Sequence, residues 1–167
     1  WPNTLDELAK YREPRRVAFL RVDVDAPRAL DEMIGKVHTF GGEVFELGPG
    51  AFVAAFGLEV VEDAPMRAAL ASLAILKATE RARGDDAAPR AKIVIHVAPV
   101  LVSRRGGQAT IDLEGKKAAW TTLGALIGLA QLDIAVVSEA SAPFLERRFE
   151  LVSGGASGPS GVTFRRL

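Results

Sequence analysis

Two long apolar runs restrict the fold of this chain more than any other feature of its sequence. VAFLRVDV covers residues 17–24, and KIVIHVAPVLV covers residues 92–102. Both runs are rich in β-branched residues, which predicts two strands buried at the centre of a sheet. Neither run approaches the roughly 18–20 apolar residues that span a bilayer. We therefore expect no membrane span in this segment.

Two helices are predicted between and beside these strands. Apolar residues recur at helical spacing over residues 30–37, and Gly41-Gly42 ends this first helix. Asp25 is expected to cap it, because an aspartate side chain can accept from the free N–H groups of a first turn. The second helix is Ala-rich and covers residues 64 to about 83, with Asp63 as its N-cap.

Gly and Pro residues divide the remaining apolar segments into strands. EVFEL and AFVAAFG flank Gly48-Pro49-Gly50, which is a hairpin signal. ATIDL, DIAVVS, RFELV and VTFRRL are also strand-like, and residues 116–130 are helical in pattern. This order predicts an α+β fold with a mixed central sheet, the βαββαβ order of ferredoxin-like sandwiches and extra C-terminal strands. We place one domain over residues 16–167, after an N-terminal linker and entry helix over residues 1–15.

Charge and composition argue against several functions. Lys and Arg total 21, as do Asp and Glu, so no net positive field gathers phosphates and we expect no nucleic-acid partner. Cysteine is absent, which excludes disulfides, thiol nucleophiles and cysteine-based zinc sites. A cytoplasmic location is expected for such a chain. Only two histidines, His38 and His96, are present, which leaves little scope for a histidine-rich metal site.

Several strings, in this order and spacing, resemble the catalytic domains of class III adenylyl and guanylyl cyclases over residues 16–166. They are RRVAFLRVDVD, GGEVFELGPGAFVAAFG, DAPMRAALASLAIL, KIVIHVAPVLV, LDIAVVSEASAPFLERRFELV and GVTFRRL. The resemblance implies a nucleotidyl cyclase-like fold. It also implies dimers, because each active site in this family needs residues from two chains. Two aspartates on adjacent strands of the family hold the two divalent ions that cyclisation requires.

The resemblance places the first metal-binding aspartate at Asp23, with Asp25 two residues along the strand. Together they form a candidate, vestigial metal site; the alternative is that they end the strand and cap the next helix. The second aspartate of the family falls at Pro49 or Gly50, neither of which has a side-chain ligand atom. We therefore expect no cofactor, and Mg²⁺ or Mn²⁺ matters only if residual nucleotide binding exists.

The other catalytic positions of the family are also replaced. Its purine-reading lysine falls near Phe45 or Glu46, and its base-reading aspartate falls within residues 112–116. Its asparagine and arginine, which orient the ribose and neutralise the phosphates, fall near Ala119 and Leu123. Alanine and leucine can do neither, so the resemblance implies that this domain is not an enzyme.

Side chains near the expected nucleotide cleft have structural interpretations. Val94 and Ala98 replace two glycines of the family and are expected to crowd the cleft. His96 is predicted to be a hydrogen-bonded core or interface residue, and Trp120 to pack in the core or in a dimer interface. Lys116-Lys117 is predicted to be a solvated pair, although a helix start can attract phosphate.

These inferences favour a catalytically inactive, regulatory or dimerisation module of a larger signalling protein. We expect it to form a homodimer or to pair with a partner signalling domain. By resemblance to bacterial architectures, the parent could be a serine/threonine protein kinase. Two alternatives stay open: a nucleotide or small-ligand sensor, and a weak cyclase completed by a partner chain that supplies the missing aspartate and arginine.

Overall fold

The computed structural model describes residues 12–59, 62–82, 89–153 and 164–167. Its strands are β1 (Arg12–Val24), β2 (Glu43–Leu47), β3 (Ala51–Phe56), β4 (Ala91–Arg105), β5 (Gln108–Ile111), β6 (Ala135–Ser138), β7 (Val152–Ser153) and β8 (Phe164–Arg166). Its α-helices are α2 (Leu30–Thr39), α3 (Ala64–Arg81), α4 (Leu113–Leu129) and α5 (Ala142–Leu145), with short 3₁₀ helices η1 (Pro27–Ala29) and η2 (Glu139–Ser141). No helix in these ranges is long and apolar enough to cross a membrane.

The strands form one mixed sheet in the order β2-β3-β1-β4-β6-β8-β7, with β5 attached to β4. The pair β4–β6 is parallel, and the other pairs are antiparallel. β1 and β4 are neighbours along the whole of β1, from Arg12 opposite Ser103 to Val24 opposite Ala91. The two apolar runs are thus the central strands, as predicted, and the fold is the predicted α+β sandwich.

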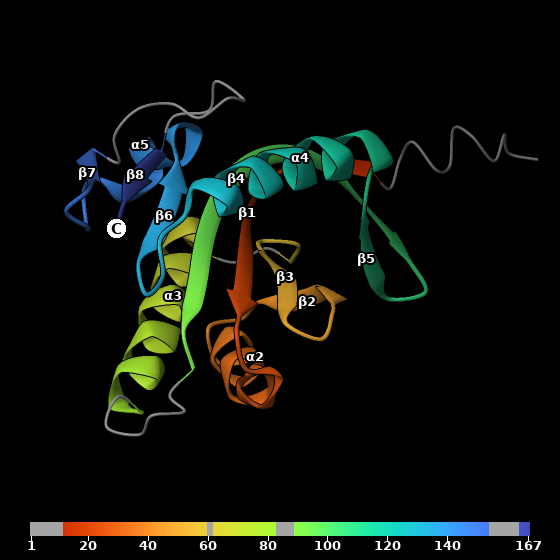
Figure 1. Cartoon of the computed structure of the whole chain (residues 1–167). Helices are drawn as coiled ribbons and strands as arrows, with labels where there is room; N and C mark the ends of the chain where they lie inside the picture. Colours follow the sequence, from red (N-terminus) through yellow and green to blue (C-terminus); the bar gives the residue numbers. More distant parts are fainter. Residues whose placement is uncertain (1–11, 60–61, 83–88, 154–163) are drawn as a thin grey trace, which may run out of the picture.

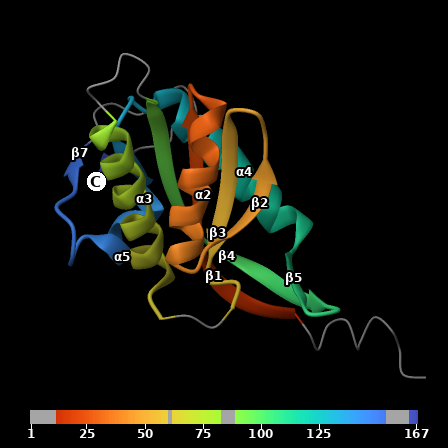
Figure 2. The same ribbon diagram turned by 90° about the horizontal axis from the view of Figure 1, so that it is seen from below.

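Helices cover both faces of the sheet (Figure 1). Figure 2 shows α2 and α3 in front of the sheet and α4 behind it. Alternation along β1 separates the two cores, because successive side chains of a strand point to opposite faces. Leu20 and Val22 belong to the core under α2 and α3, whereas Val17 and Phe19 belong to the core under α4.

The start of the domain differs from the prediction. β1 begins at Arg12 and pairs with β4 from its first residue, so residues 12–15 are strand and not linker. Residues 12–15 show no alternation of apolar and polar residues that would predict a strand, because the first three of them are exposed. The predicted entry helix lies outside the described residues.

The predicted N-cap of α3 is confirmed, whereas the N-cap of α4 was not predicted. Asp63 caps α3 as predicted, and its carboxylate accepts from the backbone N–H of Met66 at 3.4 Å. α4 begins at Leu113, before the predicted start at residue 116, because Asp112 caps it. One carboxylate oxygen of Asp112 accepts from the N–H of Gly115 at 2.9 Å.

Candidate functional site

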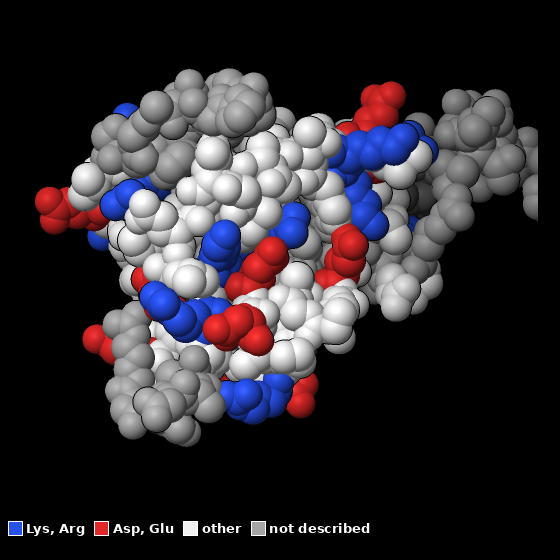
Figure 3. Space-filling model, viewed as in Figure 1, with Lys and Arg blue, Asp and Glu red and all other residues white. Residues whose placement is uncertain are grey.

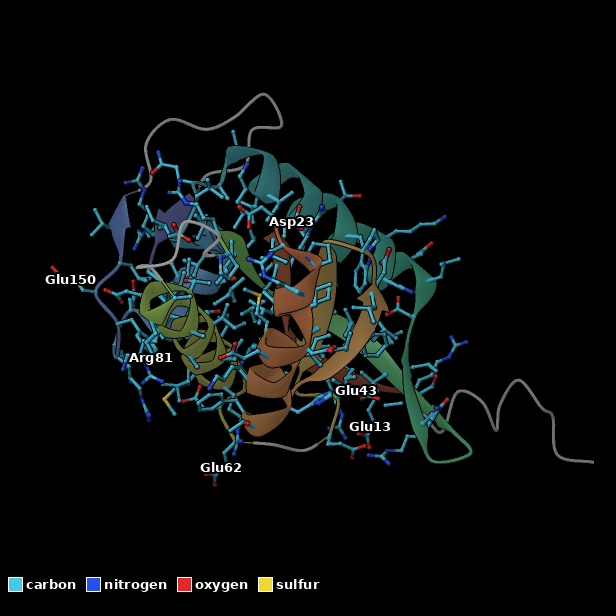
Figure 4. All side chains as sticks on the ribbon, turned by 60° about the horizontal axis from the view of Figure 1, so that its bottom comes forward. Glu13, Asp23, Glu43, Glu62, Arg81 and Glu150 are labelled. Carbon is cyan, nitrogen blue, oxygen red and sulfur yellow. The ribbon has the colours of Figure 1, made fainter. Side chains whose placement is uncertain are left out.

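The candidate site lies on the α4 side of the sheet, where β1 carries a cation and an anion in succession. Phe19, Arg21 and Asp23 occupy every second position of β1, so their side chains lie on the same face of the sheet. Phe19 is buried under α4. Arg21 and Asp23 are only partly buried, with 29% and 34% of their side chains exposed. Figure 4 labels Asp23 near the end of β1. This face therefore presents the first predicted metal ligand to solvent.

Arg21 neutralises the carboxylate of Asp23 within the same strand. Its Nε donates to Oδ1 of Asp23 at 3.0 Å and its Nη2 to Oδ2 at 3.3 Å. This two-point arrangement uses both carboxylate oxygens and matches the planar fork of the guanidinium. The carboxylate of Asp23, the first predicted metal ligand, is therefore paired with a protein cation, which the sequence pattern did not indicate.

Asp25 lies beyond the end of β1 and turns to another partner. Its Oδ1 accepts from the backbone N–H of Arg90 at 2.8 Å, and its own N–H donates to the carbonyl of Arg90 at 3.2 Å. The prediction that Asp25 caps the following helix is wrong, because the N-cap of η1 is Ala26. The structure therefore gives Asp23 and Asp25 different partners, and no cluster of three acidic or histidine residues occurs in the described ranges.

The hairpin turn brings no second carboxylate to Asp23. Gly50 lies against the end of β1, where its carbonyl accepts from the N–H of Val24 at 2.8 Å. The residue directly opposite Asp23 on β3 is Ala51. Because directly opposed residues share a face of the sheet, position 51 is where a carboxylate could join Asp23. An alanine there leaves Asp23 as the only acidic member of the pair.

We expect metal binding to appear only when both defects are repaired. The double variant Arg21→Gln/Ala51→Asp places two unpaired carboxylates on facing strands, with Cβ atoms about 4.5–5.5 Å apart. Carboxylate pairs of this kind bind divalent cations weakly, with dissociation constants of roughly 10⁻³ M. Electron paramagnetic resonance of free Mn²⁺ will measure the binding.

The matched control is Arg21→Gln/Ala51→Asn, which has the same shape but one carboxylate fewer. Neither this variant nor the unaltered chain should reduce the free Mn²⁺ signal at millimolar protein. Equal binding by the aspartate and asparagine variants would show that residue 51 does not face Asp23.

Trp120 fills the space between α4 and the sheet. Its indole ring packs edge-on against Phe19, with ring centroids 5.6 Å apart, as expected for a packing role. Its Nε1–H donates to the carboxylate of Glu46 on β2, and the ammonium of Lys116 lies 5.2 Å from the ring centroid. Glu46 stands near the predicted purine-reading position, so this position is engaged within the chain.

The other family positions on α4 also point inward or are engaged. Ala119 and Leu123 are each 1% exposed and belong to the core between α4 and the sheet. The carboxylate of Asp112 accepts from the N–H of Leu101 at 2.8 Å as well as from Gly115. Asp112, one of the two carboxylates within residues 112–116, is therefore committed to holding the start of α4 on β4.

His96 ends a short chain of polar groups inside the sheet. Its Nδ1 lies 2.7 Å from the hydroxyl of Ser138, which in turn lies 2.6 Å from the hydroxyl of Ser141. The Ser141 hydroxyl accepts from the backbone N–H of Val97 at 2.7 Å. It thus supplies a hydrogen-bond partner for this N–H of β4, just beyond the residues that pair with β6. His96 is thus hydrogen-bonded within the fold, as predicted. Ser138 stands at the N-cap of η2, but its side chain makes no capping bond there.

Burial lowers the pKa of His96 below its usual value of 6.5. The unfolded chain therefore binds a proton at this imidazole at a higher pH than the folded chain does. The free energy of unfolding should fall as the pH drops through 6.5 toward the lowered pKa, and should gain nothing from His96 above that window. His96→Gln keeps an acceptor for Ser138 but does not titrate, so it should lose less stability between about pH 7.5 and about pH 5.

Urea unfolding at a series of pH values will measure this difference. His38→Gln on the exposed side of α2 is the matched control, and it should follow the unaltered chain. Parallel pH curves for the unaltered chain and His96→Gln would contradict the prediction.

Solved structures identify the fold. Adenylyl cyclase CyaB from P. aeruginosa matches with a TM-score of 0.74 and 13% identity, over 93% of this chain and 95% of that one. The monomeric guanylyl cyclase domain of the RhoGC fusion protein from the aquatic fungus Blastocladiella emersonii matches with a TM-score of 0.69 and 13% identity, over 94% and 98%. An adenylate/guanylate cyclase/hydrolase from Silicibacter pomeroyi matches with a TM-score of 0.63 and 16% identity, over 92% and 95%.

By sequence, no family profile and no curated protein matches this chain. The structural similarity nevertheless extends over nearly the whole length of each cyclase domain. The chain therefore has the fold of the class III nucleotidyl cyclase catalytic domains, and the fold implied by the sequence strings is confirmed.

Proposed function

We propose that this domain is a catalytically inactive cyclase homology domain that serves as a regulatory and dimerisation module of a larger signalling protein. The observation that carries the proposal is the two-point ion pair between Arg21 and Asp23. It lies at the position where the resemblance places the first metal-binding aspartate, and it leaves no carboxylate oxygen free of a protein partner.

Cyclisation of a nucleoside triphosphate requires cations that activate the 3′-hydroxyl and hold the phosphates. A divalent ion at Asp23 would have to displace Arg21 and would leave that guanidinium unpaired beside a second positive charge. Ala51, opposite Asp23, offers no second carboxylate. Both effects oppose metal binding, and therefore support the absence of catalysis.

The α4 side supports the same conclusion. Ala119 and Leu123 face the domain's own core, and neither side chain carries an amide or guanidinium that could act on a transition state. Trp120 is hydrogen-bonded to Glu46 and packed on Phe19. A base would have to break these contacts before it could enter the space between α4 and β2.

Dimerisation is supported by the surface that α4 leaves open. The edge of this surface, seen in Figure 3 with α4 along the top, intermixes basic and acidic side chains. Arg21 and Asp23 lie on this face of β1, and Lys92 stands opposite Asp23 on β4. A patch with both signs of charge can match a second copy of itself across a two-fold axis. One of the similar structures is a non-canonical dimeric guanylyl cyclase domain.

Catalysis is tested with the purified chain and ATP or GTP, in the presence of Mn²⁺ or Mg²⁺. Mass spectrometry after long incubation should detect no more cyclic AMP or cyclic GMP than a heat-denatured sample does. Formation of either product with turnover would contradict the proposal. Saturable binding of nucleotides in calorimetric titrations, without product formation, would instead favour the nucleotide-sensor alternative.

Dimerisation is tested by sedimentation velocity over a wide concentration range. We expect a monomer–dimer equilibrium that Lys92→Glu weakens at least tenfold, because the substitution reverses one charge in the open patch. Lys77→Glu is the control, since Lys77 is exposed on α3, away from this surface. A strict monomer at every concentration would refute self-association.

A further inference from the structure

A second feature lies at the opposite end of β1. A cavity of about 480 Å³ is bounded by the first residues of β1, the end of β3, the first turn of α3 and α5. Glu13 borders this cavity and lies ten positions before Asp23 on the strand, which corresponds to about 33 Å. Figure 4 labels both residues and shows them well apart. The cavity is therefore separate from the Arg21–Asp23 site.

Close packing of three elements forms the floor of the cavity. Gly57 follows β3 with a φ of 101°, and a Cβ atom there would meet the Cβ of Ala64 at 2.9 Å and the carbonyl oxygen of Arg16 at 3.1 Å. Only glycine adopts this backbone conformation readily, and only glycine fits the space. The floor of the cavity is thus built from backbone segments that the fold packs closely together.

Each carboxylate that borders the cavity is already paired with an arginine. Asp63 lies 3.8 Å from Arg148, and the other two pairs are Glu13 with Arg15 at 2.7 Å and Glu59 with Arg104. The acidic groups therefore contribute little net charge to the space they surround.

Arg16 is the exception among the charged groups of the cavity. Within the described residues its guanidinium has no ion-pair or hydrogen-bond partner, and it lies 4.3 Å from the ring centroid of Phe144. Stacking on an aromatic ring holds a guanidinium in place while leaving its N–H groups free. Pro14, Pro65 and the 38% exposed Phe144 add an apolar wall beside it.

We propose that this cavity binds a small ligand that joins an oxyanion to an apolar body. A carboxylate or phosphate accepts from the N–H groups of Arg16, and the apolar body packs against Phe144 and Pro65. Planar, two-point recognition of such anions is the typical role of arginine. The volume lies within the range of small-molecule sites. This site is independent of the proposed dimerisation function.

The test is a titration of the ¹⁵N-labelled chain with sodium benzoate, phenyl phosphate and neutral benzamide. We expect saturable shifts of backbone signals around Arg16, Ala64 and Phe144 with one or both anions. Benzamide should bind at least tenfold more weakly. Saturation by benzoate alone would identify carboxylates as the ligand class, and saturation by phenyl phosphate alone would identify phosphate esters.

Arg16→Gln should weaken anion binding at least tenfold, whereas Arg12→Gln, four residues earlier on β1 and outside the cavity, should leave it unchanged. Phe144→Leu is a second variant that removes the stacking partner but retains an apolar wall, and it should also weaken binding. The absence of saturable shifts with both anions, or equal binding by Arg16→Gln and the unaltered chain, would overturn the proposal.

Discussion

Leu123→Arg is expected to lower the free energy of unfolding by roughly 3–5 kcal/mol and to confer no cyclase activity. The substitution places an arginine where the resemblance puts the family's phosphate-neutralising arginine. Leu123, however, is 1% exposed and packs in the core between α4 and the sheet. A guanidinium at this position would be buried without a carboxylate partner, and an unpaired buried charge is among the most destabilising changes known.

Chemical denaturation followed by circular dichroism will measure this loss of stability. Thr121→Arg is the matched control, because residue 121 lies on the exposed side of the same helix. Its effect should stay within about 0.5 kcal/mol. A folded Leu123→Arg variant of normal stability would show that residue 123 can turn out of the core, and would reopen the question of a catalytic role for α4.

Gly42→Ala is expected to lower the free energy of unfolding by about 2–3 kcal/mol. A Cβ atom at Gly42 would lie 2.6 Å from Cζ of Phe56 and 2.6 Å from Cγ1 of Val37. Both neighbours are completely buried, so neither side chain can move aside without disturbing the core. The Gly-Gly turn therefore lets α2 and β3 approach each other closely.

Gly35→Ala on α2 is the matched control, with the opposite expected sign. Gly35 is helical and exposed, and nothing lies within 4 Å of a Cβ atom built there. Alanine should stabilise the helix by about 0.5–1 kcal/mol, because glycine is the poorer helix former. Thermal unfolding of both variants gives the comparison, and a stable Gly42→Ala variant would contradict the packing argument.

Local sequence patterns were sufficient for most of the fold. The apolar runs of β1 and β4, the Gly-Pro-Gly hairpin and the Asp63 cap depend on residues a few positions apart in the chain. Such patterns act through the backbone geometry of their own element. The start of β1 at Arg12 was missed because those first residues are exposed and become a strand only by pairing with the far end of β4.

The candidate site was predictable only in part. The sequence located Asp23 and the position of Trp120, but not the engagement of Asp23 by Arg21 or of Trp120 by Glu46. The short Asp112-to-Gly115 spacing could have indicated the cap of α4. The contact of Asp25 with Arg90 joins residues 65 positions apart, and nothing in the local pattern around either residue indicates it.

The sequence by itself determined that residues 49 and 50 carry no side-chain ligand atom and that residues 119 and 123 carry no amide or guanidinium. Those conclusions need only the chemistry of the residues present. Only the tertiary structure decided that Arg21 holds both oxygens of Asp23, that Leu123 faces the core and that Arg16 stacks on Phe144. Strand register and helix packing select these neighbours, because contacts between distant segments depend on where the whole chain places each side chain.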